Sequence, residues 1–192
     1  MTQNARQIAE DFARLVESRS SETSHVFDVF AFRSNMAGTL VGKLREELDS
    51  LIRVIYLQNT PSISERLRLM SLTLAGEKWT RLTHNGKYAQ VTDRDMVEVA
   101  NNLNGWSESV YRFGCAFIHL SSFHDYQHSD PFAQLDPTEQ ADILRHMRAY
   151  HDGPRESSPT FADIVDYIPM IYIKIRDNLD CRLKDLLRTT AP

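Results

Sequence analysis

The residues of this chain best suited to chemistry are Arg112 and His119, in the stretch WSESVYRFGCAFIHLSSFHDYQH (residues 106–128). The stretch predicts a helix, and seven helical positions amount to about 700°, within roughly 20° of two full turns. Both side chains would therefore point to one side, as would Glu108, four residues before Arg112. A permanently charged guanidinium beside an imidazole that titrates near neutral pH suits phosphate chemistry, because one group holds the anion and the other moves the proton.

Other polar residues around this pair are candidate substrate contacts: Glu108, Asn101, Ser122 and His124. Asn101 precedes Arg112 by eleven positions, nearly three helical turns, and so lies roughly in line with it. A purely structural interpretation stands beside this one. In it, Glu108 and Arg112 form a surface ion pair and His119 is a hydrogen-bonded core histidine. Asn101 then only solvates the helix.

A metal site is the weaker alternative use of the histidines in the second half of the chain. The candidate ligands are His124, His128, His146 and His151, with Asp125 and Asp130 nearby. His124 and His128 are four residues apart, but they precede Pro131 in a segment typical of a loop. His146 and His151 are five residues apart, about 140° around a helix, which does not pair them. We therefore expect no metal and no other cofactor.

Helices must position these residues, because helical periodicity runs through most of the chain. We predict an all-α helical bundle of about five long helices, one short helix and at most one small hairpin, as a single domain over residues 1–192. The predicted helices span residues 1–19, 25–58, 62–76, 92–122, 136–151 and 160–187. Residues 20–24 are a polar connector, so that residues 1–24 form an N-terminal helix and connector.

Turn and capping residues set the limits of these helices. Capping signals occur at Ser62 or Ser64, Thr92 with Asp95, Asp136 with Pro137, and Thr160 with Asp163. We expect Gly105 to bend the helix over residues 92–122, and Pro169 to kink the last helix. Residues 78–92 do not follow the helical pattern, and Asn85-Gly86 predicts a hairpin turn there. Gly38 and Gly42 would let another helix approach closely.

Composition indicates a soluble globular protein, since 42% of the 192 residues are hydrophobic and 25% are charged. Cys115 and Cys181 lie in helical patterns, which favours reduced thiols in a cytoplasmic protein. The charged N-terminal segment lacks the apolar core of a signal peptide, and no apolar run is long enough for a membrane span. We therefore expect no membrane partner.

The formal net charge of −4 disfavours a broad nucleic-acid-binding surface. Residues 33–94 hold ten Lys and Arg against six Asp and Glu, which gives +4. Residues 1–32 give −2 and residues 95–192 give −6, and the three values sum to −4. A site for a polyanion must therefore be local.

The pair Arg112–His119 lies in an amphipathic helix, is followed by Leu-Ser-Ser, and comes after a helix with the sequence REELDSLIRVIYL. This arrangement resembles the HEPN superfamily of all-α nucleotide-handling and ribonuclease domains, whose signature is Arg-x(4–6)-His near a helix end. The resemblance covers about residues 25–187, and its specific part is the pair itself.

The resemblance implies a metal-independent endoribonuclease that acts as a homodimer, with two Arg–His pairs facing one cleft. A histidine would deprotonate the ribose 2′-OH, which attacks the adjacent phosphorus, while Arg112 offsets charge on the pentacoordinate phosphoryl group. RNA is then the expected substrate and DNA is inert. Such domains are toxins or anti-phage effectors, which implies an antitoxin or regulatory partner.

The second hypothesis is a non-catalytic helical module that binds RNA or a partner protein in a defence or toxin–antitoxin system. Phe113 favours it, because HEPN domains usually have a polar residue directly after the arginine. The acidic net charge favours it too. This hypothesis predicts that no RNA is cleaved and that Arg112 is buried against Glu108.

Overall fold

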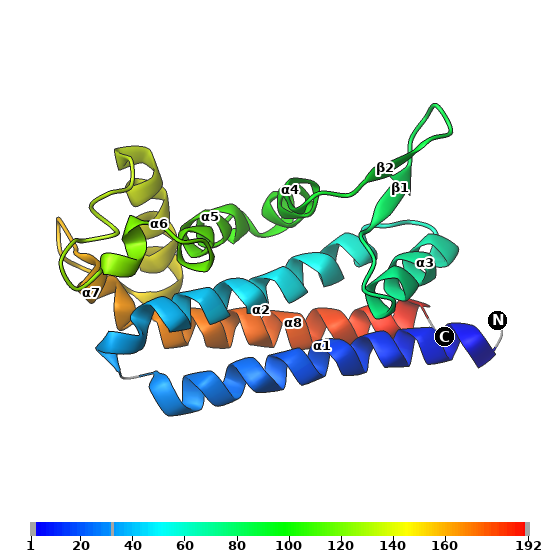
Figure 1. The fold of residues 1–192 in the computed structure, drawn as a ribbon, viewed down its shortest axis with the longest axis horizontal. Helices are drawn as coiled ribbons and strands as arrows, with labels where there is room; N and C mark the ends of the chain where they lie inside the picture. Colours follow the sequence, from blue (N-terminus) through cyan, green and yellow to red (C-terminus); the bar gives the residue numbers. More distant parts are fainter. Residues whose placement is uncertain (1–2, 32, 191–192) are drawn as a thin grey trace.

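The computed structural model describes residues 3–31 and 33–190 and confirms an all-α fold (Figure 1). Its α-helices are α1 (Gln3–Phe30), α2 (Ala37–Gln58), α3 (Ile63–Leu74), α4 (Asp93–Asn104), α5 (Ser107–Ile118), α6 (Pro137–His151), α7 (Phe161–Val165) and α8 (Ile168–Thr190). Strands β1 (Thr80–Leu82) and β2 (Tyr88–Gln90) form one antiparallel hairpin. Short 3₁₀ turns, η1 (Ser34–Met36) and η2 (Ser122–Asp125), complete the structure.

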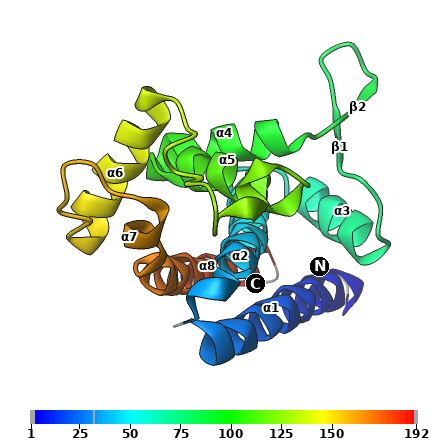
Figure 2. The same ribbon diagram turned by 60° about the vertical axis from the view of Figure 1, so that its left-hand side comes forward.

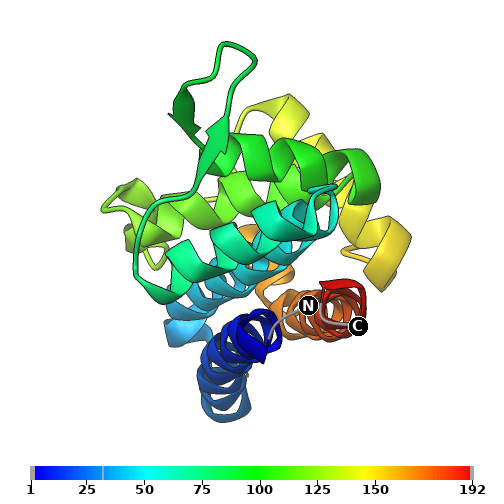
Figure 3. The same cartoon turned by 90° about the vertical axis from the view of Figure 1, so that its right-hand side faces the viewer.

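Helix α2 is the centre of the bundle and contacts α1, α4, α5 and α8. Helices α1 and α8 run alongside it on one side, and α4 and α5 cover its other side (Figures 1 and 3). Helices α6 and α7 lie near the start of α2, whereas the β1–β2 hairpin projects at the far end (Figure 2). No helix in the described ranges is long and apolar enough to cross a membrane.

The core follows the apolar stripe of α2, as the sequence predicts. Leu48, Leu51, Ile52 and Ile55 are all fully buried. They pack in one continuous cluster with apolar residues of α8 such as Ile175. Burial of these side chains is the main stabilising contribution, at about 1.5–3 kcal/mol each.

The prediction for residues 1–24 is wrong, because α1 continues through residues 20–24 to Phe30. Ser20 and Thr23 face the bundle interior and are buried. The Ser20 hydroxyl donates a hydrogen bond to the fully buried carboxylate of Glu47 on α2. Residues 20–24 are thus one more turn of α1 with two inward-facing polar side chains, and the chain turns later, between Phe30 and Ala37.

The predicted helix over residues 92–122 is two helices. Gly105 has a φ of 73° and ends α4, because its N–H bonds back to Asn101 while the chain leaves the helical path. The Thr92–Asp95 capping box at the start of α4 is confirmed. Helix α5 then ends at Ile118, short of the predicted end at Ser122.

The last predicted helix is also two helices. The Thr160–Asp163 capping box is confirmed, but it opens only the five-residue α7. Pro169 does not kink α8. It lies in the first turn of that helix, where the N–H that proline lacks would have no helical acceptor.

The remaining local signals are confirmed except the one at Gly42. Ser62 caps α3, Asp136 caps α6 with Pro137 at the next position, and Asn85-Gly86 forms the hairpin turn. Gly38 is a close-approach site, because a Cβ there would lie 3.0 Å from the Tyr126 ring. Gly42 is not one, since a Cβ there would meet nothing within 4 Å.

Candidate functional site

Helix α5 carries the predicted site and lies unusually close to α2. A Cβ on Gly114 would stand 2.6 Å from the Cβ of Arg45, so only glycine fits this crossing. The buried Arg45 guanidinium lies 3.6 Å from the centre of the Tyr111 ring on α5. The Tyr111 hydroxyl donates to Asp93 at the start of α4. These contacts fix α5 relative to both α2 and α4.

Tyr111 has a structural role here. Burial raises its pKa to about 12, against the opposing effect of the Arg45 guanidinium. The phenol therefore stays protonated at neutral pH and continues to donate to Asp93.

Arg112 projects from the outer face of α5 and keeps 62% of its side-chain surface exposed. Its guanidinium pairs with Glu108 at 3.0 Å and with Glu139 of α6 at 3.2 Å. The predicted ion pair with Glu108 is therefore present. The non-catalytic hypothesis expects Arg112 to be buried against Glu108, and this expectation is wrong. Exposed ion pairs contribute about 0–1 kcal/mol, so an incoming anion can displace them at small cost.

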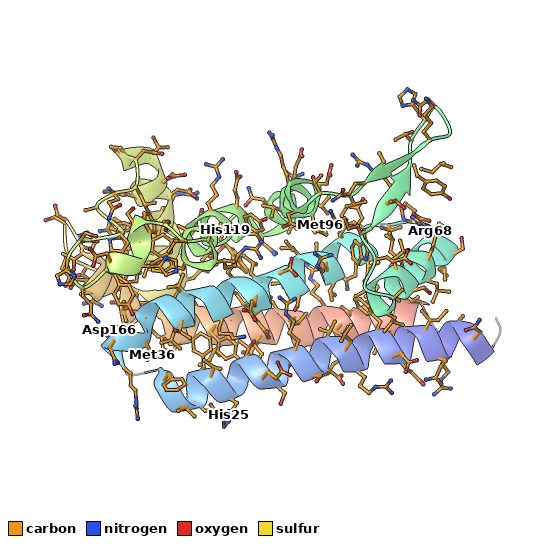
Figure 4. All side chains as sticks on the ribbon, viewed as in Figure 1. His25, Met36, Arg68, Met96, His119 and Asp166 are labelled. Atoms are coloured by element: carbon orange, nitrogen blue, oxygen red, sulfur yellow. The ribbon has the colours of Figure 1, made fainter. Side chains whose placement is uncertain are left out.

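His119 is the residue directly after α5 and has extended backbone angles, φ −93° and ψ 145°. The rotation of about 100° per residue therefore does not apply to His119. The prediction that a single helix directs Arg112 and His119 to the same side is wrong. Its side chain is exposed at the end of α5, so it is not a core histidine (Figure 4). Arg112 and His119 are both exposed and lie seven residues apart, with His119 just beyond the end of α5.

Phe113, directly after Arg112, turns inward from the site. Its ring lies 5.4 Å from that of Phe117 and 6.0 Å from that of Phe161 on α7. These aromatic rings hold the second half of α5 against α7. Packing against these rings explains an aromatic residue here, and Phe113 also lines the groove between α5 and α6 that Arg112 borders.

Arg112 borders a groove of about 340 Å³ between α5 and α6, here called the α5–α6 groove. Three predicted residues line it: Asn101, Glu108 and Arg112. Of these, Asn101 has a structural contact, because its Oδ1 accepts a hydrogen bond from the backbone N–H of Glu108 at 3.3 Å. Ser122, His124 and His119 are not among the residues that line the groove.

Ser122 and His124 make local contacts instead. Ser122 donates to the side chain of Gln134 at 2.7 Å. The His124 imidazole lies 3.4 Å from the backbone N–H of Ser121 in the η2 capping box. Both residues thus hold the loop that follows His119, and neither is directed at Arg112.

The sequence prediction missed the α6 side of the groove, which holds Glu139, Asp142 and Arg145. Ser109 and Arg145 both hydrogen-bond to Asp142. Burial acts to raise the pKa of Asp142, but the two hydrogen bonds and the charges of His146 and Arg145 together lower it. Asp142 and Arg145 are three residues apart on α6, a spacing from which their ion pair could have been predicted. The sequence does not indicate that α5 is the helix that packs beside them.

Ser109, Asp142 and His146 form a cluster beside the groove, but their arrangement does not activate the serine. The Ser109 hydroxyl donates a hydrogen bond directly to Asp142, while the His146 imidazole lies 3.6 Å from the other carboxylate oxygen. In a nucleophilic triad the imidazole stands between the hydroxyl and the carboxylate. Ser109 is therefore a hydrogen-bond partner of Asp142.

The histidines considered as metal ligands do not gather. His128 pairs with Asp125 at 2.7 Å on the surface. His146 and His151 line a separate apolar cavity of about 70 Å³ beneath α6, and burial lowers the pKa of both. Within the part of the chain that the structure describes, no three His, Cys, Asp or Glu side chains could hold one ion.

Comparison with known proteins gives no further assignment. No family model, no curated protein and no solved structure matches this chain. The candidate site therefore depends on the residues described above, with Arg112 and His119 as its exposed reactive groups.

Proposed function

We propose that this protein is a cytoplasmic, metal-independent endoribonuclease that uses Arg112 and His119. The observation that supports it most is that both groups are exposed, Arg112 in the middle of α5 and His119 directly after its end. Neither is needed to hold the core, so the structural interpretation of His119 fails. A charged guanidinium and an imidazole that are both open to solvent, seven residues apart, are suited to binding and cleaving an RNA phosphodiester.

The proposed step is an attack of the ribose 2′-oxygen on the adjacent phosphorus. His119 removes the 2′-OH proton, the new O–P bond forms, and the bond to the 5′-oxygen breaks. Arg112 stabilises the negative charge on the phosphoryl oxygens through paired N–H donors. A second histidine or a water molecule protonates the leaving 5′-oxygen, so that the products are a 2′,3′-cyclic phosphate and a free 5′-OH.

We further propose that the active form is a homodimer built at the end of α5. Leu120 is 96% exposed and Ile118 is 47% exposed, on either side of His119. Contiguous exposed apolar surface marks places that another chain covers, and these two side chains supply such surface beside His119. Such a dimer would bring two His119 side chains toward one cleft and supply the second histidine. An antitoxin or other regulatory partner could cover the same surface.

The decisive test is cleavage of a labelled RNA by His119→Ala and Arg112→Ala. Each variant should abolish cleavage and leave the melting temperature nearly unchanged, because both side chains are exposed. The matched controls are His25→Ala and Arg6→Ala on α1, on the far side of α2 (Figure 4). Arg6 resembles Arg112 in pairing with a glutamate four residues away. Full activity in either site variant would contradict the proposal.

Two companion measurements test the chemistry and the dimer. Activity should persist in EDTA, and replacing the 2′-OH at the cleaved position by hydrogen should abolish it. Leu120→Glu should convert the dimer to a monomer in light scattering and remove cleavage. A dimeric and active Leu120→Glu variant would refute the proposed interface.

A non-catalytic binding module remains the second candidate, and the charge of the α5–α6 groove favours it. Two arginines there face three carboxylates, since Arg112 and Arg145 pair with Glu108, Glu139 and Asp142. This balance disfavours a bound polyanion unless Arg112 releases its partners. The module hypothesis predicts stable binding of RNA or a protein, with no cleavage of any RNA by the wild-type chain.

A further inference from the structure

The hairpin arm, residues 78–92, is a basic element in an acidic chain. It contains Lys78, Arg81 and Lys87 together with His84, and no acidic residue. The arm therefore has a formal charge of +3, against −4 for the whole chain. The ion pair between Arg81 and Asp95, at 3.0 Å, offsets one of these charges. The two lysines have no ion pair with any residue in the described ranges.

The hairpin arm is anchored at its base and shaped at its tip. Trp79 and Val91 are buried, and the Val91 N–H donates to the Trp79 carbonyl at 2.8 Å. At the tip, Gly86 takes a positive φ of 76°, and the Thr83 hydroxyl donates to the Lys87 carbonyl at 2.6 Å. An isolated two-stranded hairpin is only marginally stable, so these anchors hold an otherwise exposed ribbon in place.

One face of the hairpin arm presents apolar and aromatic surface to solvent. Leu82 and Tyr88 are cross-strand partners, and they are 61% and 64% exposed. The guanidinium of Arg68 on α3 lies 5.2 Å from the centre of the Tyr88 ring, and it also bonds to the Thr80 carbonyl. Arg68, labelled on α3 in Figure 4, thus contacts the Tyr88 ring and leaves most of this residue exposed.

We propose that the hairpin arm binds single-stranded RNA, with a base stacked on Tyr88 and phosphates beside Lys78 and Lys87. An exposed aromatic ring on a basic element is the combination that sequence-tolerant binders of single strands use. The choice of RNA over another polyanion rests on the proposed ribonuclease function. The arm, α4 and α5 lie along the same side of the molecule, so one strand could pass from the arm toward Arg112 and His119 (Figure 1).

The test measures binding in the full chain with His119→Ala, so that RNA stays intact. The probe is a fluorescent, unstructured 20-nucleotide RNA, and the readout is anisotropy over a range of salt concentrations. Tyr88→Ala should weaken binding at least about five-fold, because a stacked base contributes roughly 1–3 kcal/mol. Tyr88→Phe should bind like the parent, since the ring is kept. Replacing Lys78 and Lys87 by alanine should reduce the slope of log K against log salt by about 1.4, at about 0.7 per phosphate contact.

The matched controls lie at other places on the molecule. Tyr150→Ala removes a half-exposed tyrosine that also has a cation on its ring, Lys174 at 4.2 Å. Lys184→Ala removes an exposed lysine of α8. Both variants should bind RNA like the parent, and loss of affinity in the controls equal to that in the arm variants would overturn the inference.

Three further outcomes overturn the inference: no RNA binding by the parent, unchanged affinity in the Tyr88→Ala variant, or binding by the arm to anionic vesicles in place of RNA. Failure of the ribonuclease proposal gives a different result. In that case wild-type protein cleaves no RNA, while the hairpin-arm variants still lose affinity for the probe.

Discussion

Replacing Gly114 by alanine tests the placement of α5, on which the whole site depends. A methyl group on Gly114 would stand 2.6 Å from the Cβ and 3.1 Å from the Cγ of Arg45. The Cβ of Arg45 moves only with the backbone of α2, so α5 and α2 must separate. That separation would disturb the buried Arg45 guanidinium and its contact with Tyr111.

The expected loss of stability follows from two opposing effects. Overpacking a well-packed contact costs about 1–3 kcal/mol. Alanine in a helix interior regains about 0.5–1 kcal/mol relative to glycine. We therefore expect a net destabilisation of about 1–2 kcal/mol. For a chain of this size each kcal/mol lowers the melting temperature by about 2–4 °C, so the variant should melt about 2–8 °C below wild type.

Gly42→Ala is the matched control, because Gly42 lies within α2 and a Cβ there would meet nothing within 4 Å. It should keep only the gain in helix propensity and be about 0.5–1 kcal/mol more stable. Urea unfolding followed by circular dichroism measures both variants. The close approach of α5 to α2 is wrong if Gly114→Ala is as stable as wild type or more stable.

Three other predictions address charge and burial. Glu139→Gln removes one charged partner of Arg112 on the surface. It should change the free energy of unfolding by less than about 1 kcal/mol but tighten RNA binding. An unchanged affinity would show that Arg112 does not contact RNA. Burial raises the pKa of Glu47, and one of its carboxylate oxygens has no partner among the described residues. The contribution of Glu47 to stability is therefore full below its unfolded pKa and is lost as pH rises through its higher folded pKa. The Glu47→Gln variant should accordingly melt at a higher temperature than wild type at about pH 8 and at a similar temperature at about pH 4. Equal melting temperatures at both values would argue that this carboxyl is ionised without penalty. Tyr111→Phe loses only the hydrogen bond to Asp93 and should cost about 1 kcal/mol, whereas Tyr111→Leu also removes the ring from the buried Arg45 and should cost clearly more, as chemical denaturation can measure.

Local signals in the sequence were sufficient for the fold class and most helix starts. The capping box of Thr92 with Asp95 and the turn at Asn85-Gly86 depend on neighbouring residues only, and both were predicted correctly. The connection between the first two helices was misplaced because Ser20 and Thr23 are typical of a loop. Both are buried, and the Ser20 hydroxyl bonds to Glu47, which comes more than twenty residues later in the chain.

One ion pair of the candidate site was predicted from the sequence, but the geometry around it was not. Arg112 and Glu108 pair as their spacing on a helix indicates. The orientation of His119 could not be predicted, because the helix ends one residue before it, and the chain has no strong stop signal there. Glu139 was missed for a different reason. Its contact with Arg112 depends on how α6 packs beside α5, and no local pattern encodes that packing.

The hairpin arm also divides the chain into two parts that complete one core. The segment before its turn contains α1, α2 and α3, and the segment after it contains α4 through α8. Helix α2 packs against α4, α5 and α8, so neither segment can bury its apolar surface without the other. The first residues of α1 and the last residues of α8 lie at the same end of the bundle (Figure 3). Expressed as two fragments split at Asn85-Gly86, or as one chain with joined ends and new termini there, the protein should therefore reassemble its native core.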